Sequence, residues 1–244
     1  EFCSLISTYT GFEYVQTTSS GSDALFKILF SLKVQGKDIL IPNYICSEVY
    51  FAVIASGGNP VLYDNEKYSW VSSLEKINRA ITKNTAAVVF NHTFGIPFKG
   101  LNVFLNIYPE IITINDCCHA IPKKARIMDE DVSNTDFCFF SFNSTKLLAT
   151  GEGGAISTNN KSLFSLLTKN KIFKGISDIN AALGISQLRR LDYFLERRKD
   201  IANYYFKRLS NTFTKYSPNE SQFFRFPVVV SEFQMDSLLM NDKI

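Results

Sequence analysis

The sequence lacks any apolar run long enough to span a bilayer, and no N-terminal stretch resembles a secretory signal. It also lacks a long basic run, because 26 Lys and Arg against 23 Asp and Glu leave a net charge of only +3. Neither a membrane nor a nucleic acid is therefore an expected partner. No internal repeat or low-complexity linker interrupts the chain, so nothing indicates a repeat architecture.

The five cysteines form no C-x-x-C pair, and their number is odd. A disulfide framework and a zinc site are both disfavoured, so we expect reduced thiols, no metal and a cytoplasmic protein. The first residue is Glu1 rather than Met, which predicts a fragment or a processed chain.

What is present is an ordinary composition for a chain with a sizeable core, with 45% hydrophobic and 20% charged residues. Short apolar runs alternate with amphipathic segments, and this alternation predicts an α/β fold with a mostly parallel, doubly wound sheet in three αβα layers. The expected strands cover residues 14–18, 38–41, 60–64, 86–90, 111–114, 137–140, 155–157 and 223–230. One expected helix begins at 19–22, and the others cover residues 47–55, 72–81, 181–208 and 232–241.

The first strand leads into a serine- and glycine-rich turn that opens a helix. Ser20 or Ser22 can cap this helix, and Asp23 suits the positive end of its dipole. Such a junction, with Gly21 in the turn, also offers free backbone N–H groups to a phosphate. Capping alone explains the same residues.

The segment 141–154 contains one lysine, Lys146, in a small-polar loop between two buried strands. Partial desolvation would favour its neutral amine and make it a usable nucleophile. The alternative is a surface lysine in a turn. Ligands in such sheets bind outside the carboxyl ends of the strands. Ser22, His92, Asp116 and Lys146 all fall at those ends, and this convergence predicts a site.

Asp116 ends a buried strand, where a carboxylate often only caps the next helix. In a functional site, it would pair with a protonated pyridine nitrogen and keep that ring an electron sink, as pyridoxal phosphate chemistry requires. Lys146 would then bind the cofactor's aldehyde carbon and later move a proton. His119, about one helical turn beyond Asp116, would touch the ring or its phenolic oxygen, unless it is a structural hydrogen-bonding residue.

Several ordered segments resemble the DegT/DnrJ/StrS sugar aminotransferases, fold-type I enzymes that use pyridoxal phosphate. The resemblance runs from about Gly11 to the end of the chain, and its motifs are SGS-x-AL from Ser20, IPNY from Ile41, NHTFGIP from Asn91, NDCCHA from Asn115, SFNSTKLLATGEGG from Ser141 and ISDINAAL from Ile176. It implies a large cofactor-binding domain at 1–186, and a connecting helix with the start of an incomplete small domain at 187–244.

The resemblance also implies roles for single residues. Lys146 would carry the cofactor, Asp116 would hold its ring nitrogen, and His119 would lie at the ring. The phosphate would lie at Gly21, Ser22 and Asp23 together with Ser141. In the family, the active site lies at a homodimer interface.

Three departures from the family pattern are visible. Cys46 stands at the position of the family's ring-stacking aromatic residue, for which Tyr44 is a candidate substitute. Phe173 and Gly175 stand where the family carries an Asn and an Arg that reach the partner's phosphate. Lys171 or Lys174 is then the nearest source of that charge, unless both only solvate a surface loop.

The function that follows is transfer of an amino group, with glutamate as donor, to a keto sugar linked to a nucleotide, for cell-surface polysaccharide or glycan biosynthesis. The lysine favours this reaction over the family's dehydratase branch, in which a histidine replaces it. The alternative is a truncated, catalytically weak homologue with a binding or regulatory role. A nicotinamide-binding enzyme is disfavoured because G-x-G-x-x-G does not follow the first strand.

Overall fold

A computed structural model describes residues 1–169, 174–209 and 220–228. In this part of the chain, seven strands form one mixed sheet in the order β1-β9-β8-β5-β4-β2-β3. The β1–β9 and β8–β9 pairs are antiparallel and the other pairs are parallel. The strands are β1 (Tyr14–Thr18), β2 (Asp38–Pro42), β3 (Asn59–Tyr63), β4 (Thr85–Asn91), β5 (Ile112–Asp116), β8 (Phe137–Ser141) and β9 (Gly154–Thr158).

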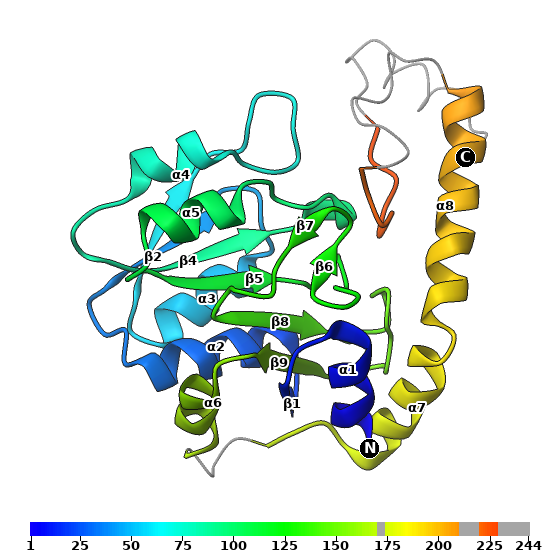
Figure 1. The fold of residues 1–244 in the computed structure, drawn as a ribbon, viewed down its shortest axis with the longest axis horizontal. Helices are drawn as coiled ribbons and strands as arrows, with labels where there is room; N and C mark the ends of the chain where they lie inside the picture. The colour runs from blue at the N-terminus through cyan, green and yellow to red at the C-terminus, as the bar shows by residue number, and fades with distance from the viewer. Residues whose placement is uncertain (170–173, 210–219, 229–244) are drawn as a thin grey trace.

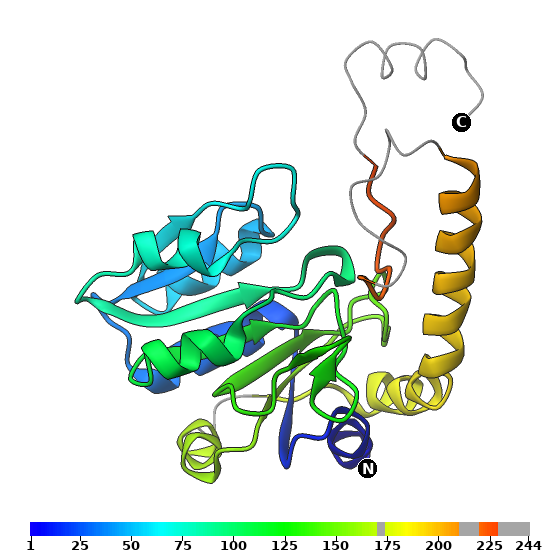
Figure 2. The ribbon, with the colours of Figure 1, turned by 45° about the horizontal axis from the view of Figure 1, so that its top comes forward.

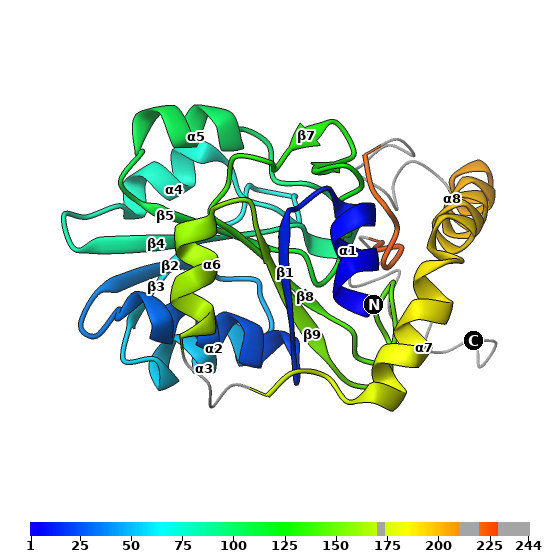
Figure 3. The same ribbon diagram turned by 60° about the horizontal axis from the view of Figure 1, so that its bottom comes forward.

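Two hydrophobic clusters cover the two faces of the sheet, because successive side chains of each buried strand point to opposite faces. In β4, for example, Val88 and Phe90 belong to one cluster, and Ala87 and Val89 belong to the other. Figure 3 shows α4 and α5 on one side of the sheet and α2 and α3 on the other. The three-layer, mostly parallel fold expected from the sequence is confirmed.

The helices on these faces follow the expected pattern closely. α3 has the expected bounds, and the helix that opens after Ser19 runs to Leu32. The helices of the sheet region are α2 (Gly21–Leu32), α3 (Ser47–Ala55), α4 (Leu74–Ala80), α5 (Leu101–Ile107) and α6 (Lys161–Thr168). The short elements are the 3-10 turn η1 (Thr93–Gly95) and the hairpin of β6 (Arg126–Ile127) and β7 (Glu130–Asp131).

The long helix expected over 181–208 is instead two helices, α7 (Asp178–Leu188) and α8 (Leu191–Arg208). Arg190 interrupts the helix, with φ −108° and ψ 3°. α7 packs on an unexpected N-terminal helix, α1 (Phe2–Thr10), where a Cβ at Gly184 would lie 2.4 Å from the Phe2 ring. The break lets α7 stay on α1 while α8 departs from the sheet (Figure 1).

The expected strand over 223–230 is not a strand in its described part, residues 223–228. The described segment 220–228, drawn in orange-red, lies near the carboxyl ends of β4 and β5 (Figures 1 and 2). It hydrogen-bonds to η1 instead, from Gln222 N to Gly95 O and from Phe224 N to Phe94 O, both at 3.0 Å. Bonds to an irregular turn cannot extend into a strand ladder.

The expected helix over 232–241 lies outside the described residues. Among the helices of the described part, none has the length and apolarity that crossing a bilayer requires. The division into domains at 186/187 stays a prediction.

Candidate active site

A cavity of about 750 Å³ lies at the carboxyl ends of the parallel strands. The predicted site residues that line it are Gly21, Ser22, Asp116, His119, Ser141 and Lys146. Asp23 does not line it, because its carboxylate accepts the N–H of Ser19 at 2.9 Å and pairs with Lys27 at 2.8 Å. The sheet topology thus brings together residues that come from three different parts of the sequence, 21–22, 116–119 and 141–146.

The start of α2 forms one end of the cavity. Ser20 caps the helix, since its hydroxyl accepts the Asp23 N–H at 3.0 Å. The N–H groups of Gly21 and Ser22 precede the first helical hydrogen bond, and they have no partner among the described residues. Their free N–H groups and the helix dipole suit an anion.

Gly21 is required at this helix start because the chain approaches it closely. A Cβ at Gly21 would lie 2.9 Å from the Cβ of Ser141 and 3.2 Å from the sulfur of Cys118. The space at the start of α2 therefore remains free for a ligand only if position 21 has no side chain. The unpaired N–H groups and the adjacent Ser141 hydroxyl fit a phosphate group, because the Asp23 carboxylate of the same turn bonds to Ser19 and Lys27 instead of lining the cavity.

Lys146 lies in the loop that joins the antiparallel strands β8 and β9. Backbone bonds close this loop, including Phe142 N to Gly153 O at 2.8 Å and Ser144 N to Gly151 O at 3.0 Å. Leu147 is buried beneath it. Lys146 is half-buried, and its ammonium forms no ion pair with a carboxylate in the described part of the chain. The loop therefore places at the cavity an amine that is not held in a salt bridge.

Asp116 ends β5, and one of its oxygens accepts the Cys118 N–H at 2.9 Å. Burial raises the pKa of Asp116 above its usual value, while bonds from Cys118 and the charge of Lys146 oppose the shift. The Cys118 side chain also bonds to this carboxylate, and Asp116 lines the cavity. A carboxylate in this place suits a protonated ring nitrogen, since a cation would offset the cost of burying it.

His119 is enclosed by two aromatic rings. Its imidazole stacks on Phe224, with centroids 4.1 Å apart, and lies parallel to Phe94 at 6.1 Å. Burial, together with the charges of Lys146 and Arg225, lowers the pKa of His119 to about 3. The Phe94 N–H donates to Nδ1 at 3.4 Å, so the neutral ring carries its proton on Nε2.

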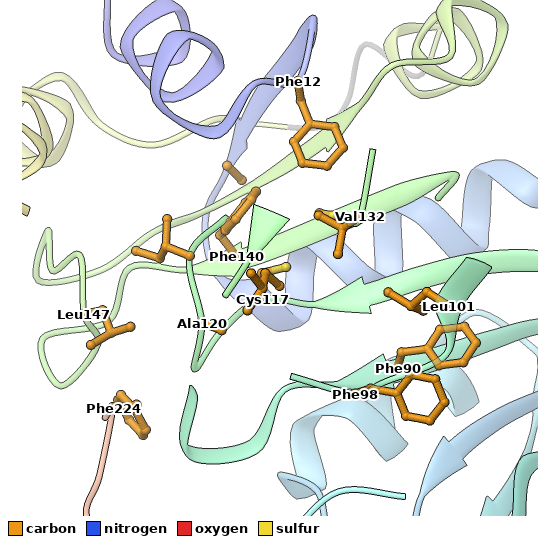
Figure 4. Close-up of a cluster of buried hydrophobic side chains, with 14 of the residues drawn as sticks. Phe12, Phe90, Phe98, Leu101, Cys117, Ala120, Val132, Phe140, Leu147 and Phe224 are labelled. Atoms are coloured by element: carbon orange, nitrogen blue, oxygen red, sulfur yellow. The ribbon is translucent and has the colours of Figure 1, made fainter. Parts of the chain in front are cut away.

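Phe224 is a site residue that the sequence did not reveal. It belongs to the same buried cluster as Leu147 and lies beside it (Figure 4). The Lys146 ammonium lies 5.1 Å from the Phe224 ring centroid. Arg198 of α8 binds the carbonyls of Phe223 and Phe224 at 3.3 and 3.2 Å. No sequence signal links position 224 to position 146, because only the fold brings them together.

His92, which the sequence placed at the same edge, has both ring nitrogens engaged within the protein. Nε2 lies 3.1 Å from Asn115 Oδ1, and Nδ1 accepts the Phe98 N–H at 3.1 Å. Burial lowers the pKa of His92 to about 4, although the bond to Asn115 opposes the shift. His92 therefore has a structural role at the cavity's edge.

Tyr44 and Phe94 line another side of the cavity, and Trp70 packs against both; we call these three rings the aromatic wall. Trp70 lies 5.6 Å from Tyr44 and 5.3 Å from Phe94, measured between ring centroids. Cys46 also lines the cavity and is exposed at the start of α3. Tyr44, the candidate substitute for the family's ring-stacking residue, also lines the cavity, and its stacking role stays a prediction.

Together, the three-layer sheet, the lysine on the β8–β9 loop and the buried carboxylate after β5 define an α/β domain with the fold of the pyridoxal phosphate-dependent transferases of fold type I. The particular family follows from comparison. The sequence profile of the DegT/DnrJ/EryC1/StrS aminotransferase family matches residues 1–242, and the chain belongs to that family.

Among its relatives, the chain is 26% identical to GDP-perosamine synthase of Escherichia coli O157:H7, over 89% of this chain and 64% of the relative. It is 28% identical to dTDP-4-amino-4,6-dideoxy-D-glucose transaminase of Shigella dysenteriae, over 83% and 59%. The crystal structure of NtdA from Bacillus subtilis with bound cofactor PMP has a TM-score of 0.86 and 24% identity, over 98% of this chain and 60% of that one. The chain thus spans about three fifths of these relatives' length.

Proposed function

We propose that this protein is a pyridoxal phosphate-dependent aminotransferase that transfers an amino group, with glutamate as donor, to a keto sugar linked to a nucleotide. The observation that carries the proposal is the uncommitted Lys146 amine, in one cavity with the buried Asp116 carboxylate and the open start of α2. The named relatives act on GDP- and dTDP-linked sugars, and this supports the substrate class.

When bound, pyridoxal phosphate supplies a ring that withdraws electrons from the substrate carbon next to the nitrogen. Asp116 holds the proton on the ring nitrogen, because a carboxylate there stabilises the cationic ring. Gly21 and Ser22 bind the phosphate through backbone N–H groups, and the Ser141 hydroxyl adds a hydrogen bond.

Lys146 would hold the cofactor through Nζ, and its free amine would move a proton at the substrate carbon next to the nitrogen. The backbone bonds of the β8–β9 loop position the Lys146 backbone for both roles. His119, neutral at physiological pH, donates from Nε2 to an oxygen on the ring, because Nδ1 is already occupied by the Phe94 N–H.

The proposal includes a homodimer. Four large apolar side chains near the cavity are 40% to 59% exposed: Tyr50, Phe51 and Ile54 of α3, and Leu62 of β3. α3 begins at the cavity, where Glu48 and Val49 line it, so a partner on this face would lie beside the site. Sedimentation at micromolar concentration with and without pyridoxal phosphate tests this, and a monomer that binds the cofactor tightly would contradict it.

The structure describes only one of the two lysines proposed to reach the partner's phosphate. Lys171 lies outside the described residues. Lys174 is exposed, and its carbonyl accepts the Lys27 ammonium of α2 at 2.7 Å. A Cβ at Gly175 would lie 2.8 Å from the Thr17 hydroxyl, so an arginine does not fit there. Lys174→Ala is expected to weaken cofactor affinity if the charge role holds, whereas unchanged affinity would remove Lys174 from the site.

The enzymatic test combines the protein with pyridoxal phosphate, glutamate and GDP- or dTDP-linked keto sugars. We expect 2-oxoglutarate and an amino sugar nucleotide in equal amounts. Cofactor binding without any transfer to keto sugars would contradict the proposed substrate class and favour the binding or regulatory role instead.

A further inference from the structure

Asn91 carries an unsatisfied acceptor in the active-site cavity. The residue is 4% exposed and lines the cavity, and its Oδ1 has no hydrogen-bond partner among the described residues. A buried acceptor without a partner is costly, and such groups in folded proteins call for an explanation. One explanation is a ligand that donates a hydrogen bond to Asn91 Oδ1.

The orientation of the Asn91 amide follows from its surroundings. Its Nδ2 donates to the carbonyl of Tyr44 at 3.4 Å and to the hydroxyl of Thr93. An exchange of oxygen and nitrogen would place two acceptors against each other at Tyr44, because a carbonyl cannot donate. Oδ1 is therefore the atom that remains without a partner.

The position of Asn91 points to the ligand. Asn91 ends β4 and pairs in parallel register with Asp116, which ends β5. Residues paired in this way project from the same face of the sheet. Two acceptors, an amide oxygen and a carboxylate, thus stand side by side at the cavity's base, and together they select a ligand that presents N–H or O–H groups.

Two other asparagines allow a comparison. Asn115, which directly precedes Asp116 in β5, is buried, and its side chain is bonded at both ends, Oδ1 to His92 and Nδ2 to the Thr135 hydroxyl. Asn65 also has an Oδ1 without a partner, but it does not line the cavity. Asn65 therefore provides a matched control.

We propose that Asn91 is a ligand-binding residue whose Oδ1 accepts a hydrogen bond from the molecule held between Asp116 and Lys146. The inference rests on the proposed function, and it adds a residue to the set that the sequence indicated. The donor is either the ring N–H of pyridoxal phosphate, shared with Asp116, or a hydroxyl of the sugar substrate.

The test compares Asn91→Leu with Asn65→Leu in the whole protein. Leucine has the same number and branching of side-chain heavy atoms as asparagine, with a larger volume, and it removes the acceptor. The first measurement is a spectroscopic titration with pyridoxal phosphate and with its 1-deaza analogue, in which C–H replaces the ring nitrogen. If the ring is the donor, Asn91→Leu raises the dissociation constant for pyridoxal phosphate about two- to tenfold and leaves that for the analogue unchanged.

If a sugar hydroxyl is the donor, both cofactor constants stay at the wild-type values, and the KM for the keto sugar rises by a similar factor. Either result supports the proposal and identifies the donor. Unchanged cofactor affinity and unchanged KM in Asn91→Leu, as in Asn65→Leu, would overturn it. Asn91→Thr, which keeps a hydroxyl oxygen, replaces Asn91→Leu if the leucine variant does not fold, and it should retain more affinity than Asn91→Ala. Failure of wild-type protein to bind pyridoxal phosphate would instead refute the proposed function.

Discussion

Different interactions hold the two ends of the cavity in place. The start of α2 and the β8–β9 loop are formed by residues close together in sequence, within 19–23 and 141–154. The aromatic wall and Phe224 come from four separate segments, and the last lies beyond α8. Local hydrogen bonds fix the first end, whereas long-range packing of rings fixes the second. The comparison indicates that the residues proposed to hold the cofactor are positioned by local structure, whereas the shape of the aromatic end of the cavity depends on the whole fold.

The strongest test of the local end is Lys146→Ala. Transamination should fall by about 10⁴-fold or more, because both the covalent attachment and the proton-transfer group are removed. Steady-state formation of 2-oxoglutarate measures this. Lys161→Ala, a change of the same kind on α6, is the control and should keep wild-type activity. Substantial turnover in Lys146→Ala would show that another amine serves the site.

Asp116→Asn comes next in expected effect. The amide cannot hold a proton on the ring nitrogen, so turnover should fall about 10²- to 10³-fold, with the fold intact. Circular dichroism and the cofactor's visible spectrum check that folding and binding persist. Near-wild-type turnover would mean that Asp116 only accepts the Cys118 N–H in the turn that follows β5.

The contrast between local and long-range interactions also explains which features could be predicted from the sequence and which could not. The strands, α2 and α3 follow from apolar periodicity and from serine caps, which act over a few residues. Lys146 and Asp116 were found because each follows a buried strand. Phe224 was missed, because its contact with His119 depends on how α8 leaves the sheet. The break at Arg190 was missed for the same reason, since packing of Gly184 on Phe2 decides it.

Phe224→Leu tests the long-range end. The ring that stacks on His119 and faces Lys146 is lost, so turnover should fall about tenfold or less, and the pH dependence of the cofactor's absorbance should shift. Phe223→Leu in the same segment is the matched control, because Phe223 packs on Phe206 and Phe226 instead. Both variants should lose stability, typically by less than about 1.5 kcal/mol. Identical spectra for both would make Phe224 a packing residue only.

The last prediction concerns stability and His92, away from the reaction itself. The folded-state pKa of about 4 lies below the unfolded value of 6.5, so the unfolded chain binds a proton first as the pH falls. This contribution is fully present above pH 6.5 and is lost toward pH 4. Between pH 7 and pH 5, the wild-type protein should lose about 2 kcal/mol more unfolding free energy than His92→Asn. Urea unfolding at both pH values measures the difference, and equal losses would show that His92 titrates normally.

The measurement that most directly tests the central claim is borohydride reduction of the protein with pyridoxal phosphate, followed by peptide mapping. The account predicts a visible absorbance band that disappears on reduction, and a pyridoxyl group on Lys146 alone. Labelling of Lys171 or Lys174 in place of Lys146, or the absence of any stable label, would contradict it.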